Sequence, residues 1–263
     1  MKPLSVSLII TTYNAPDYLS LCIKSVLTQT QLPNEILIAD DGSGEATRLL
    51  IENYSKSSPI TIKHVWQPDS GFRVSAIRNK AILAAKHEYI IQIDGDVILN
   101  PHFIADHIKY AKPNTYIGAS RCYIKEVYSK LILKEQYINF REIKEYCRIK
   151  FNSKRIPLLT PLFLKSKSHN LVRIQGCNMA YWRKDAIRIN GYNEDIQGWG
   201  SEDSEFAIRL SNSGLKKNYL KFSAIAYHIW HEKASRASHK KNNEIMYDAL
   251  NTKSTYVPNG IKK

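Results

Sequence analysis

The sequence YIIQIDGDVIL at residues 89–99 ends an apolar run with two carboxylates, Asp94 and Asp96. Short, β-branched apolar runs are typical of strands that are covered on both faces. Alternate residues of an extended segment point the same way, so both carboxylates can face one divalent cation. A solvated Asp-Gly turn is the alternative, and the tripeptide alone favours it. Its position after a core strand, on the same edge as Asp40 and Asp41, favours the metal site.

Further runs of the same kind occur in the first 120 residues, with amphipathic helical patterns between them. The apolar runs cover residues 6–10, 35–40, 60–65 and 115–120. The helical patterns cover residues 16–29, 45–54, 74–86 and 101–111. This alternation predicts an α/β fold with a mostly parallel central sheet and helices on both faces.

Three of the predicted strands end in polar or acidic clusters. These are TTYN (11–14), DDGS (40–43) and DGD (94–96). Because ligands of parallel sheets bind beyond the carboxyl ends of the strands, we expect the clusters to meet on one edge. The DDGS segment alone is also ordinary turn and helix-start chemistry, with Ser43 as the cap.

Residues 121–170 interrupt the alternation with a basic segment. It contains 12 Lys or Arg against 4 Glu, a local surplus of +8 within a net charge of +14. We expect one long helix there, followed by a proline-containing loop. A strand at 171–175, a turn at 191–193, a helix start at 201–205 and strands near 217–228 follow, before a basic, asparagine-rich tail.

Composition restricts the classes of function. The net charge of +14 suggests a polyanionic neighbour: nucleic acid, anionic lipid or a phosphorylated substrate. The four scattered cysteines show no CxxC or zinc-type spacing, which is typical of reduced thiols in a cytosolic protein. The amino-terminal apolar run is short and lacks a small-residue cleavage site, so we interpret it as a strand. No run approaches the roughly 18 apolar residues of a membrane span.

Two motifs in the second half carry further candidate groups. GWGSEDSEF (198–206) sets glycines around Trp199 and opens a helix with Glu202 and Asp203. The helix dipole favours carboxylates in a first turn, so these acids can be structural. An ionised carboxylate beside an aromatic ring is also suited to accept a proton from a sugar hydroxyl. YHIWHEK (227–233) carries His228 and His231, a spacing that alone is a weak metal signature.

Taken together and in this order, the motifs resemble those of the inverting family-2 glycosyltransferases, whose nucleotide-sugar-binding fold is called GT-A. The resemblance rests on VSLIITTYN, EILIADDGS, GFRVSAIRNKAI, EYIIQIDGDVILNPHFI, GCNMAYWRKDAIRINGYNEDIQGWGSEDSEFAIRL and AYHIWH. It covers nearly all of the chain except residues 121–170 and the tail. The second half also resembles the carboxyl-terminal segment shared by β-1,4-galactosyltransferases and chondroitin-polymerase-type enzymes.

The resemblance implies donor-binding roles for six positions, one of which, Asp94, belongs to the family's DxD motif. Thr11 and Tyr13 match residues that hold the base of the donor. Asp41 matches the acid that recognises uracil, and Asp40 is the weaker candidate of the pair. Arg78 matches a basic contact to the ribose or the diphosphate of the donor.

The resemblance also implies a metal and a catalytic base. In the family's DxD motif, Asp94 lies nearer the ribose and Asp96 binds Mn²⁺ or Mg²⁺. His228 matches a metal-binding histidine, with His231 as the alternative. Asp203 matches the catalytic base, and its acceptor-facing neighbours are Glu202 and Trp199.

The function that the resemblance implies is a metal-dependent, inverting hexosyl- or N-acetylhexosaminyltransferase. It would move a sugar from a nucleotide sugar, with a UDP-sugar favoured, to a glycan hydroxyl in cell-surface polysaccharide or lipopolysaccharide biosynthesis. Residues 1–120 would bind the donor and residues 121–263 the acceptor, within one compact cytoplasmic domain. Our hypothesis is that the basic segment rests on anionic lipid at the inner face of the membrane, where a lipid-linked acceptor would be presented. A solvated helix that covers the acceptor site is the alternative.

Other functions fit the sequence less well. A catalytically silent nucleotide-sugar- or nucleic-acid-binding protein is the alternative to an enzyme. Five acids on one edge would repel nucleic-acid phosphates, so we expect no nucleic-acid partner. A nicotinamide-dependent Rossmann enzyme would carry G-x-G-x-x-G after the first strand, where this chain has TTYNAP. A nucleotidyltransferase would carry a glycine-rich, lysine-bearing loop near the start.

Overall fold

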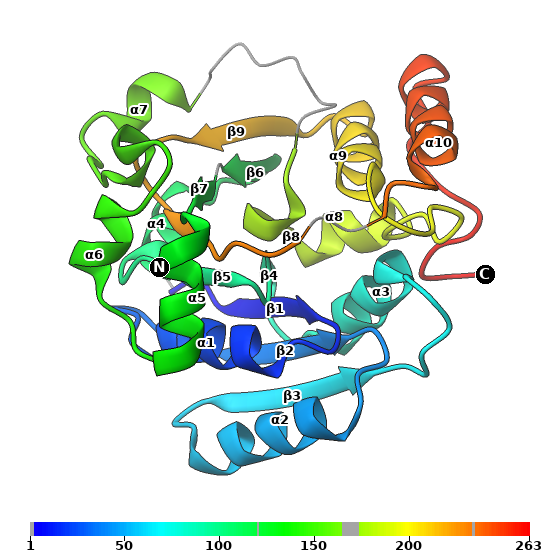
Figure 1. Ribbon diagram of the computed structural model, residues 1–263. Coiled ribbons are helices and arrows are strands. Elements are labelled where there is room, and N and C mark those ends of the chain that lie inside the picture. Colours follow the sequence, from blue (N-terminus) through cyan, green and yellow to red (C-terminus); the bar gives the residue numbers. More distant parts are fainter. Residues whose placement is uncertain (1–2, 120, 165–173, 233–234) are drawn as a thin grey trace.

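A seven-stranded sheet forms the centre of the structure, a computed structural model that describes residues 3–119, 121–164, 174–232 and 235–263. Its strands are β1 (Val6–Thr12), β2 (Glu35–Asp40), β3 (Thr61–Trp66), β4 (Tyr89–Asp94), β6 (Thr115–Ala119), β8 (Met179–Trp182) and β9 (Lys216–Leu220). The order is β3-β2-β1-β4-β8-β6-β9, and the first four of these strands are parallel. Strand β8 is antiparallel to β4 and β6, and β9 is parallel to β6. The predicted α/β fold with a mostly parallel sheet is confirmed (Figure 1).

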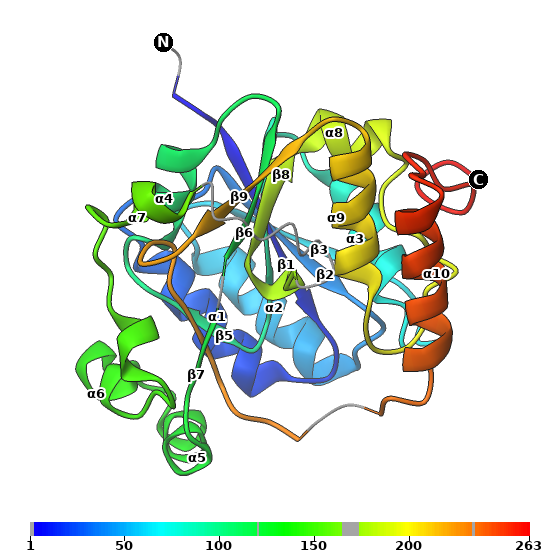
Figure 2. The same ribbon diagram turned by 90° about the horizontal axis from the view of Figure 1, so that it is seen from above.

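Helices cover both faces of the sheet. They are α1 (Pro16–Leu27), α2 (Glu45–Ser57), α3 (Val74–Ala84), α4 (Phe103–Tyr110), α8 (Arg183–Arg188) and α9 (Glu202–Asn212), and α10 (His239–Asn251) packs on the outside of α9. The first four confirm the predicted helices. On β1, Leu8 and Ile10 pack with α1, α2 and α4, whereas Ile9 packs on the opposite face with α3, α8 and α9. In Figure 2, α3, α8 and α9 lie together on one side of the molecule.

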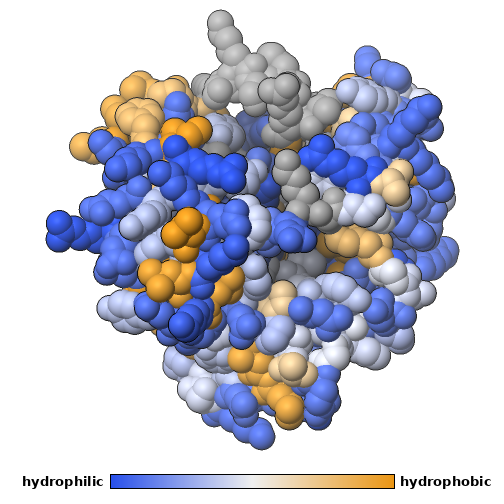
Figure 3. Space-filling model, viewed as in Figure 1, coloured by the Kyte–Doolittle hydropathy of each residue, from blue (hydrophilic) through white to orange (hydrophobic). Residues whose placement is uncertain are grey.

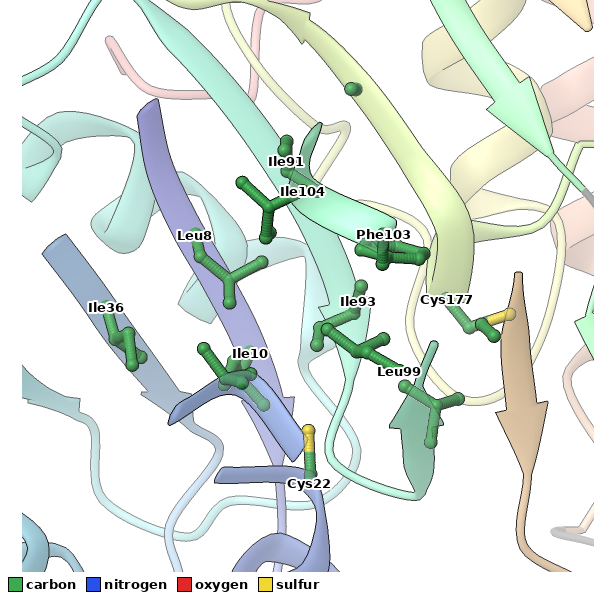
Figure 4. Packing of buried hydrophobic residues seen from close by; sticks show 14 of the residues in the cluster. Leu8, Ile10, Cys22, Ile36, Ile91, Ile93, Leu99, Phe103, Ile104 and Cys177 are labelled. Carbon is green, nitrogen blue, oxygen red and sulfur yellow. The ribbon is translucent and has the colours of Figure 1, made fainter. Parts of the chain in front are cut away.

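Continuous apolarity in the strands follows from this two-sided burial, because each strand needs apolar side chains in both directions. Figure 4 shows Leu8 and Ile10 of β1 beside Ile91 and Ile93 of β4, all of which are fully buried. Burial of one such side chain contributes roughly 1.5–3 kcal/mol to folding. The sheet edge that carries the strand ends is therefore a rigid platform.

A second, three-stranded sheet lies next to the end of β4. It consists of β5 (Val97–Leu99), β10 (Ala226–His228) and β7 (Arg121–Tyr123), in the order β5-β10-β7. Strand β10 is antiparallel to β5 and parallel to β7. The register pairs His228 with Val97, the residue after Asp96. This small sheet therefore brings the YHIWHEK motif to the DGD motif.

The expectation of one long helix in residues 121–170 is wrong. The described part contains β7, α5 (Glu126–Glu135), α6 (Phe140–Glu145), the 3-10 helix η1 (Lys150–Ser153) and α7 (Thr160–Phe163). Helix α5 stops at Gln136, which adopts the left-handed conformation with φ 51°. Asn139 then starts α6, because its side chain accepts hydrogen bonds from the N–H groups of Arg141 and Glu142.

Four further features concern the remaining predictions. The expected strand at 171–175 lies mostly outside the described residues, and residues 174–175 are not in a strand. The tail forms helix α10, which the sequence patterns did not predict and which packs on α9. All four cysteines are free and buried. Across the four described ranges, no helix combines the length and the apolarity that crossing a bilayer requires.

Candidate active site

The three strand-end clusters meet on one edge of the sheet, as predicted. Thr11 is in register with Asp94, and Thr12 is in register with Asp40. The N–H of Gly95 donates to the carbonyl of Thr11 at 2.8 Å, which ties the DGD turn to the end of β1. The acids that the sequence places 54 residues apart are thus separated by one strand.

Arg78 lies at the centre of this edge. It extends from α3, is 2% exposed, and donates to Asp94 at 3.0 Å, Asp203 at 2.8 Å and Glu202 at 3.3 Å. Its Nε also lies 3.3 Å from the hydroxyl of Thr11. Burial disfavours the guanidinium charge, but the carboxylates outweigh it and hold the pKa of Arg78 above its ordinary value. Arg78 therefore joins the strand-end acid to the acids at the start of α9.

Asp203 is held by donors on two sides. Besides Arg78, it accepts a hydrogen bond from the N–H of Gly176 at 2.8 Å and from the hydroxyl of Tyr192 at 3.3 Å. A Cβ at position 176 would lie 2.2 Å from a carboxylate oxygen of Asp203, so only glycine fits there. These hydrogen bonds fix the direction of the carboxylate.

A buried amide supports this arrangement from below. Gln92 accepts hydrogen bonds from the hydroxyls of Tyr181 and Tyr192, each at 2.9 Å. Its own NH₂ donates to the carbonyl of Gly176 at 3.2 Å. Gln92 thereby positions two of the groups that hold Asp203.

Glu202 is a buried carboxyl group whose pKa is raised. Its residue is 9% exposed, and one carboxyl oxygen is buried without a hydrogen-bond partner among the described residues. Burial, followed by the charge of Asp203, raises the pKa of Glu202 to about 7. Trp199 lies at the edge of this region, where its ring stacks on His239 and beneath Arg236.

Asp96 forms a second cluster with both candidate histidines. Its Oδ2 lies 3.3 Å from Nε2 of His228 and 3.0 Å from Nε2 of His231. Burial opposes the charge of Asp96, yet the two imidazoles hold its pKa well below its usual range. One ligand atom from each residue lies within 4.8 Å of the others. The sequence offered His228 and His231 as alternatives, and the structure brings both to Asp96.

The Asp96 cluster fits a divalent cation. Oδ1 of Asp96 and Nδ1 of His228 are buried without partners among the described residues. A carboxylate with two imidazoles is a donor set that suits Mn²⁺ and related divalent ions. Three protein ligands also leave coordination positions for oxygens of another molecule.

Asp41 and Asp40 have different surroundings at the end of β2. Asp41 accepts hydrogen bonds from Gln67 at 2.5 Å and from the N–H of Arg73 at 2.7 Å. Asp40 is fully buried between the N–H of Ser43 and the ring of His64, each at 2.8 Å. Asp40 therefore shapes the turn and leaves no exposed side chain for a donor.

Tyr13 is the most exposed of the predicted donor residues. Its ring is 48% exposed, and its hydroxyl donates to Asp69 at 2.8 Å. The hydrogen bond to Asp69 raises the pKa of the Tyr13 hydroxyl. An exposed aromatic ring beside Thr11 can stack on a planar base.

Three residues of the site were not identified from the sequence. Arg121 starts β7, lies 3.3 Å from the sulfur of Cys177, and favours the charge of Asp94. It could not be told apart from the other basic residues of its segment. Gln92 had a signal, since it is the one polar side chain inside the apolar run YIIQI. The only signal for Gly176 was that it is a glycine, because its closeness to Asp203 depends on the fold.

The fold and this edge define a GT-A glycosyltransferase: a sheet whose strand ends carry the acids, joined to a carboxylate at a helix start. The model of the family described as Glycosyl transferase family 2 matches residues 7–189. A second model, described as N-terminal domain of galactosyltransferase, matches residues 165–232. The chain therefore belongs to glycosyl transferase family 2, which confirms the predicted resemblance and enzyme class.

Individual relatives agree with the family. Chondroitin synthase of Escherichia coli is 27% identical over 245 residues, which cover 85% of this chain and 34% of the synthase. The chain thus spans about a third of that relative. Staphylococcus aureus TarS 1–349 in complex with UDP-GlcNAc superposes with a TM-score of 0.68 at 16% identity, covering 95% of this chain and 66% of that one. The Pyrobaculum calidifontis mannosyltransferase PcManGT, in complex with GDP-Man and Mn²⁺, gives 0.64 at 15% identity, covering 96% and 66%.

Proposed function

We propose that the protein is a metal-dependent, inverting glycosyltransferase that moves a sugar from a UDP-sugar to a hydroxyl of a glycan acceptor. The observation that carries this proposal is the pair of adjoining clusters. Arg78 joins Asp94 to the carboxylate of Asp203, and two residues beyond Asp94 lies the Asp96 cluster. The residues that could bind a metal ion and a diphosphate thus lie on the same edge of the sheet as a carboxylate that could accept a proton.

Asp203 acts in the proposed reaction as the general base. It accepts the proton of the acceptor hydroxyl while that oxygen forms a bond to the anomeric carbon of the donor. The N–H of Gly176 and the guanidinium of Arg78 hold its carboxylate in place before the acceptor arrives. Glu202 directly precedes Asp203 and Trp199 lies four residues before it in the chain, and both would contact the acceptor.

The bond from the anomeric carbon to the diphosphate breaks as the new bond forms. Attack and departure on opposite faces invert the anomeric configuration, and no covalent enzyme intermediate is needed. A diphosphate leaves without a protonating acid, so the two carboxylates are not an acid–base pair of the glycosidase type.

Asp96, His228 and His231 would hold the metal ion. A divalent cation there, Mn²⁺ or Mg²⁺, supplies positive charge against the negative charge that grows on the leaving diphosphate. Arg121 adds a fixed cation close to Asp94. The Mn²⁺ bound to PcManGT supports the use of a divalent cation.

UDP is the proposed nucleotide because of the residues at the ends of β1 and β2. Asp41 is held in place by Gln67 and Arg73 and would pair with the polar edge of uracil, while Tyr13 would stack on the ring. The UDP-GlcNAc bound to TarS supports a UDP-sugar donor, either a hexose or an N-acetylhexosamine. The likeness to chondroitin synthase supports a glycan acceptor. We propose that the reaction belongs to cell-surface polysaccharide or lipopolysaccharide assembly on the cytoplasmic side.

A thermal-shift panel tests the donor and the metal together. We expect UDP to raise the melting temperature only when Mn²⁺ is present, and GDP and dTDP to raise it less. Asp96→Ala should lose the response, whereas Asp248→Ala, at an exposed acid of α10, should keep it. An equal response to all three nucleotides would contradict the UDP assignment.

A further inference from the structure

The described residues 121–164 expose an unusual amount of apolar surface. Ten of the 18 large apolar side chains that are exposed among the described residues lie between positions 123 and 162. Six of them are more than half exposed: Val127, Tyr137, Ile149, Phe151, Leu158 and Leu162. Exposed apolar side chains gathered in one segment of a globular protein mark a candidate interaction surface.

The same residues carry a strong positive charge. Residues 121–164 contain ten Lys or Arg against four Glu, and eight of the ten basic residues are exposed. Two of the four Glu residues pair with exposed basic residues of their own helices, Glu126 with Lys130 and Glu145 with Arg141. The uncompensated charge of this surface is therefore positive.

Helices α5, α6 and α7 present these residues on one side of the molecule. They follow one another along that side in both Figure 1 and Figure 2. Figure 3 shows apolar areas over α7 and around α5, with hydrophilic residues between them. Residues 121–164, with these helices, form what we name the α5–α7 surface.

We propose that the α5–α7 surface docks on an anionic lipid bilayer. Apolar side chains enter the boundary between headgroups and acyl chains, and basic side chains stay at the anionic headgroups. Both halves of this chemistry are present, with the basic residues placed between the apolar ones. A protein partner would want a patch in which charged residues are depleted at the centre, which this surface does not provide.

The surface adjoins the metal cluster of the active site. The guanidinium of Arg148 lies 5.9 Å above the ring of Tyr123, and that ring lies 5.3 Å from the ring of His228. If the proposed glycosyl transfer is correct, a docked bilayer lies beside the diphosphate end of the site. An acceptor anchored in the same bilayer is then presented to Asp203.

Vesicle flotation of the 263-residue chain tests the proposal. We expect the protein to float with phosphatidylcholine vesicles that contain phosphatidylglycerol and to stay behind with phosphatidylcholine alone. Salt should weaken the binding, because the headgroup attraction is screened. Absence of flotation with anionic vesicles at low salt, or equal flotation with neutral ones, would overturn the proposal.

Matched variants locate the contact. Lys144→Glu with Lys150→Glu changes the charge of the surface, and Leu158→Ser with Leu162→Ser removes apolar groups that are 89% and 76% exposed. We expect each pair to weaken vesicle binding at least about tenfold, since each basic residue near an anionic surface contributes substantially. Lys240→Glu with Lys241→Glu on α10, and Leu49→Ser on α2, make the same changes elsewhere and should bind as the parent does.

Two readouts keep the result unambiguous. Circular dichroism and the melting temperature without ligand show that each variant is folded. Sedimentation at several protein concentrations shows whether Leu158→Ser with Leu162→Ser dissolves an oligomer, and that result would assign the surface to self-association instead. Failure of vesicle binding leaves the nucleotide panel unchanged, so the docking proposal and the proposed activity fail separately.

Discussion

Arg78 balances more negative charge than one guanidinium carries, and its loss should be costly. Asp94, Glu202 and Asp203 all accept its hydrogen bonds in a buried space. Removing the cation from such a group leaves uncompensated carboxylates and costs about 3–5 kcal/mol. We expect Arg78→Met to lower the free energy of unfolding in urea by that amount. Arg48→Met, at an exposed pair on α2, should change it by less than about 1 kcal/mol.

Asp203→Asn should separate catalysis from donor binding. The amide keeps the size of the side chain and cannot accept the proton, so we expect kcat to fall by about 10²–10⁴-fold. The affinity for UDP with Mn²⁺ should stay within about twofold, because the base does not contact the diphosphate. Retained turnover would mean that another residue is the catalytic base, and Glu202 would be the next candidate.

The raised pKa of Glu202 makes stability depend on pH. Its folded pKa of about 7 exceeds the ordinary value of 4.5, so the fold favours the neutral acid. This contribution is fully present below pH 4.5 and is lost as the pH rises through 7. Glu202→Gln should therefore gain stability relative to the parent, by about 1–3 kcal/mol, between pH 5 and pH 8.5. Urea unfolding at both pH values measures the difference, and a pH-independent difference would contradict the assignment.

At the level of elements, the 3-10 turn η2 (Gly176–Asn178) determines how closely Asp203 approaches the sheet. Gly176→Ala would place a methyl group on the carboxylate and push it away from Arg78. We expect a loss of turnover at least as large as a hundredfold, with donor affinity retained. Gly44→Ala is the control, because its nearest neighbour would lie 3.9 Å from the added Cβ.

Sequence patterns predicted the strands that are buried on both faces and the helices whose ends are marked by nearby residues. The strands that end at or beside Thr11, Asp41 and Asp94 were predicted because the apolar runs are short and β-branched. Helix α9 was predicted from the acids of its first turn. The prediction of one long helix in residues 121–170 was wrong because the left-handed Gln136 and the cap at Asn139 divide the segment. The segment also lacks a continuous apolar stripe that would have marked its helices.

The contacts that β8 and β10 of the second half make could not be predicted from local patterns. Strand β8 enters the sheet antiparallel between β4 and β6, and β10 reaches Asp96 from 132 residues away in sequence. Pairing of this kind depends on the packing of the whole chain, which no local pattern encodes. For the same reason the sequence left His228 and His231 as alternatives, although one strand end presents both.

For the whole molecule, the order of the strands predicts a single cooperative unit. The two predicted halves share one sheet, since β8 of the second half covers the edge of β4. We expect the isolated 1–120 fragment to aggregate or stay unfolded, because its edge strand is long and apolar. In the full chain, urea unfolding followed by circular dichroism and by tryptophan fluorescence should give coincident transitions. Two separate transitions would contradict a single domain.

The acidic edge of the sheet in a cationic molecule selects which anions can bind there. The overall surplus of +14 draws nucleoside diphosphates toward the protein, while Asp94, Asp96 and Asp203 repel them at the last few ångströms. We therefore expect a nucleoside diphosphate to bind there only together with a divalent cation. Titration calorimetry should therefore find UDP binding abolished by a chelator and restored by Mn²⁺. Free phosphate and metal-free nucleotides would bind weakly, because the same carboxylates repel them.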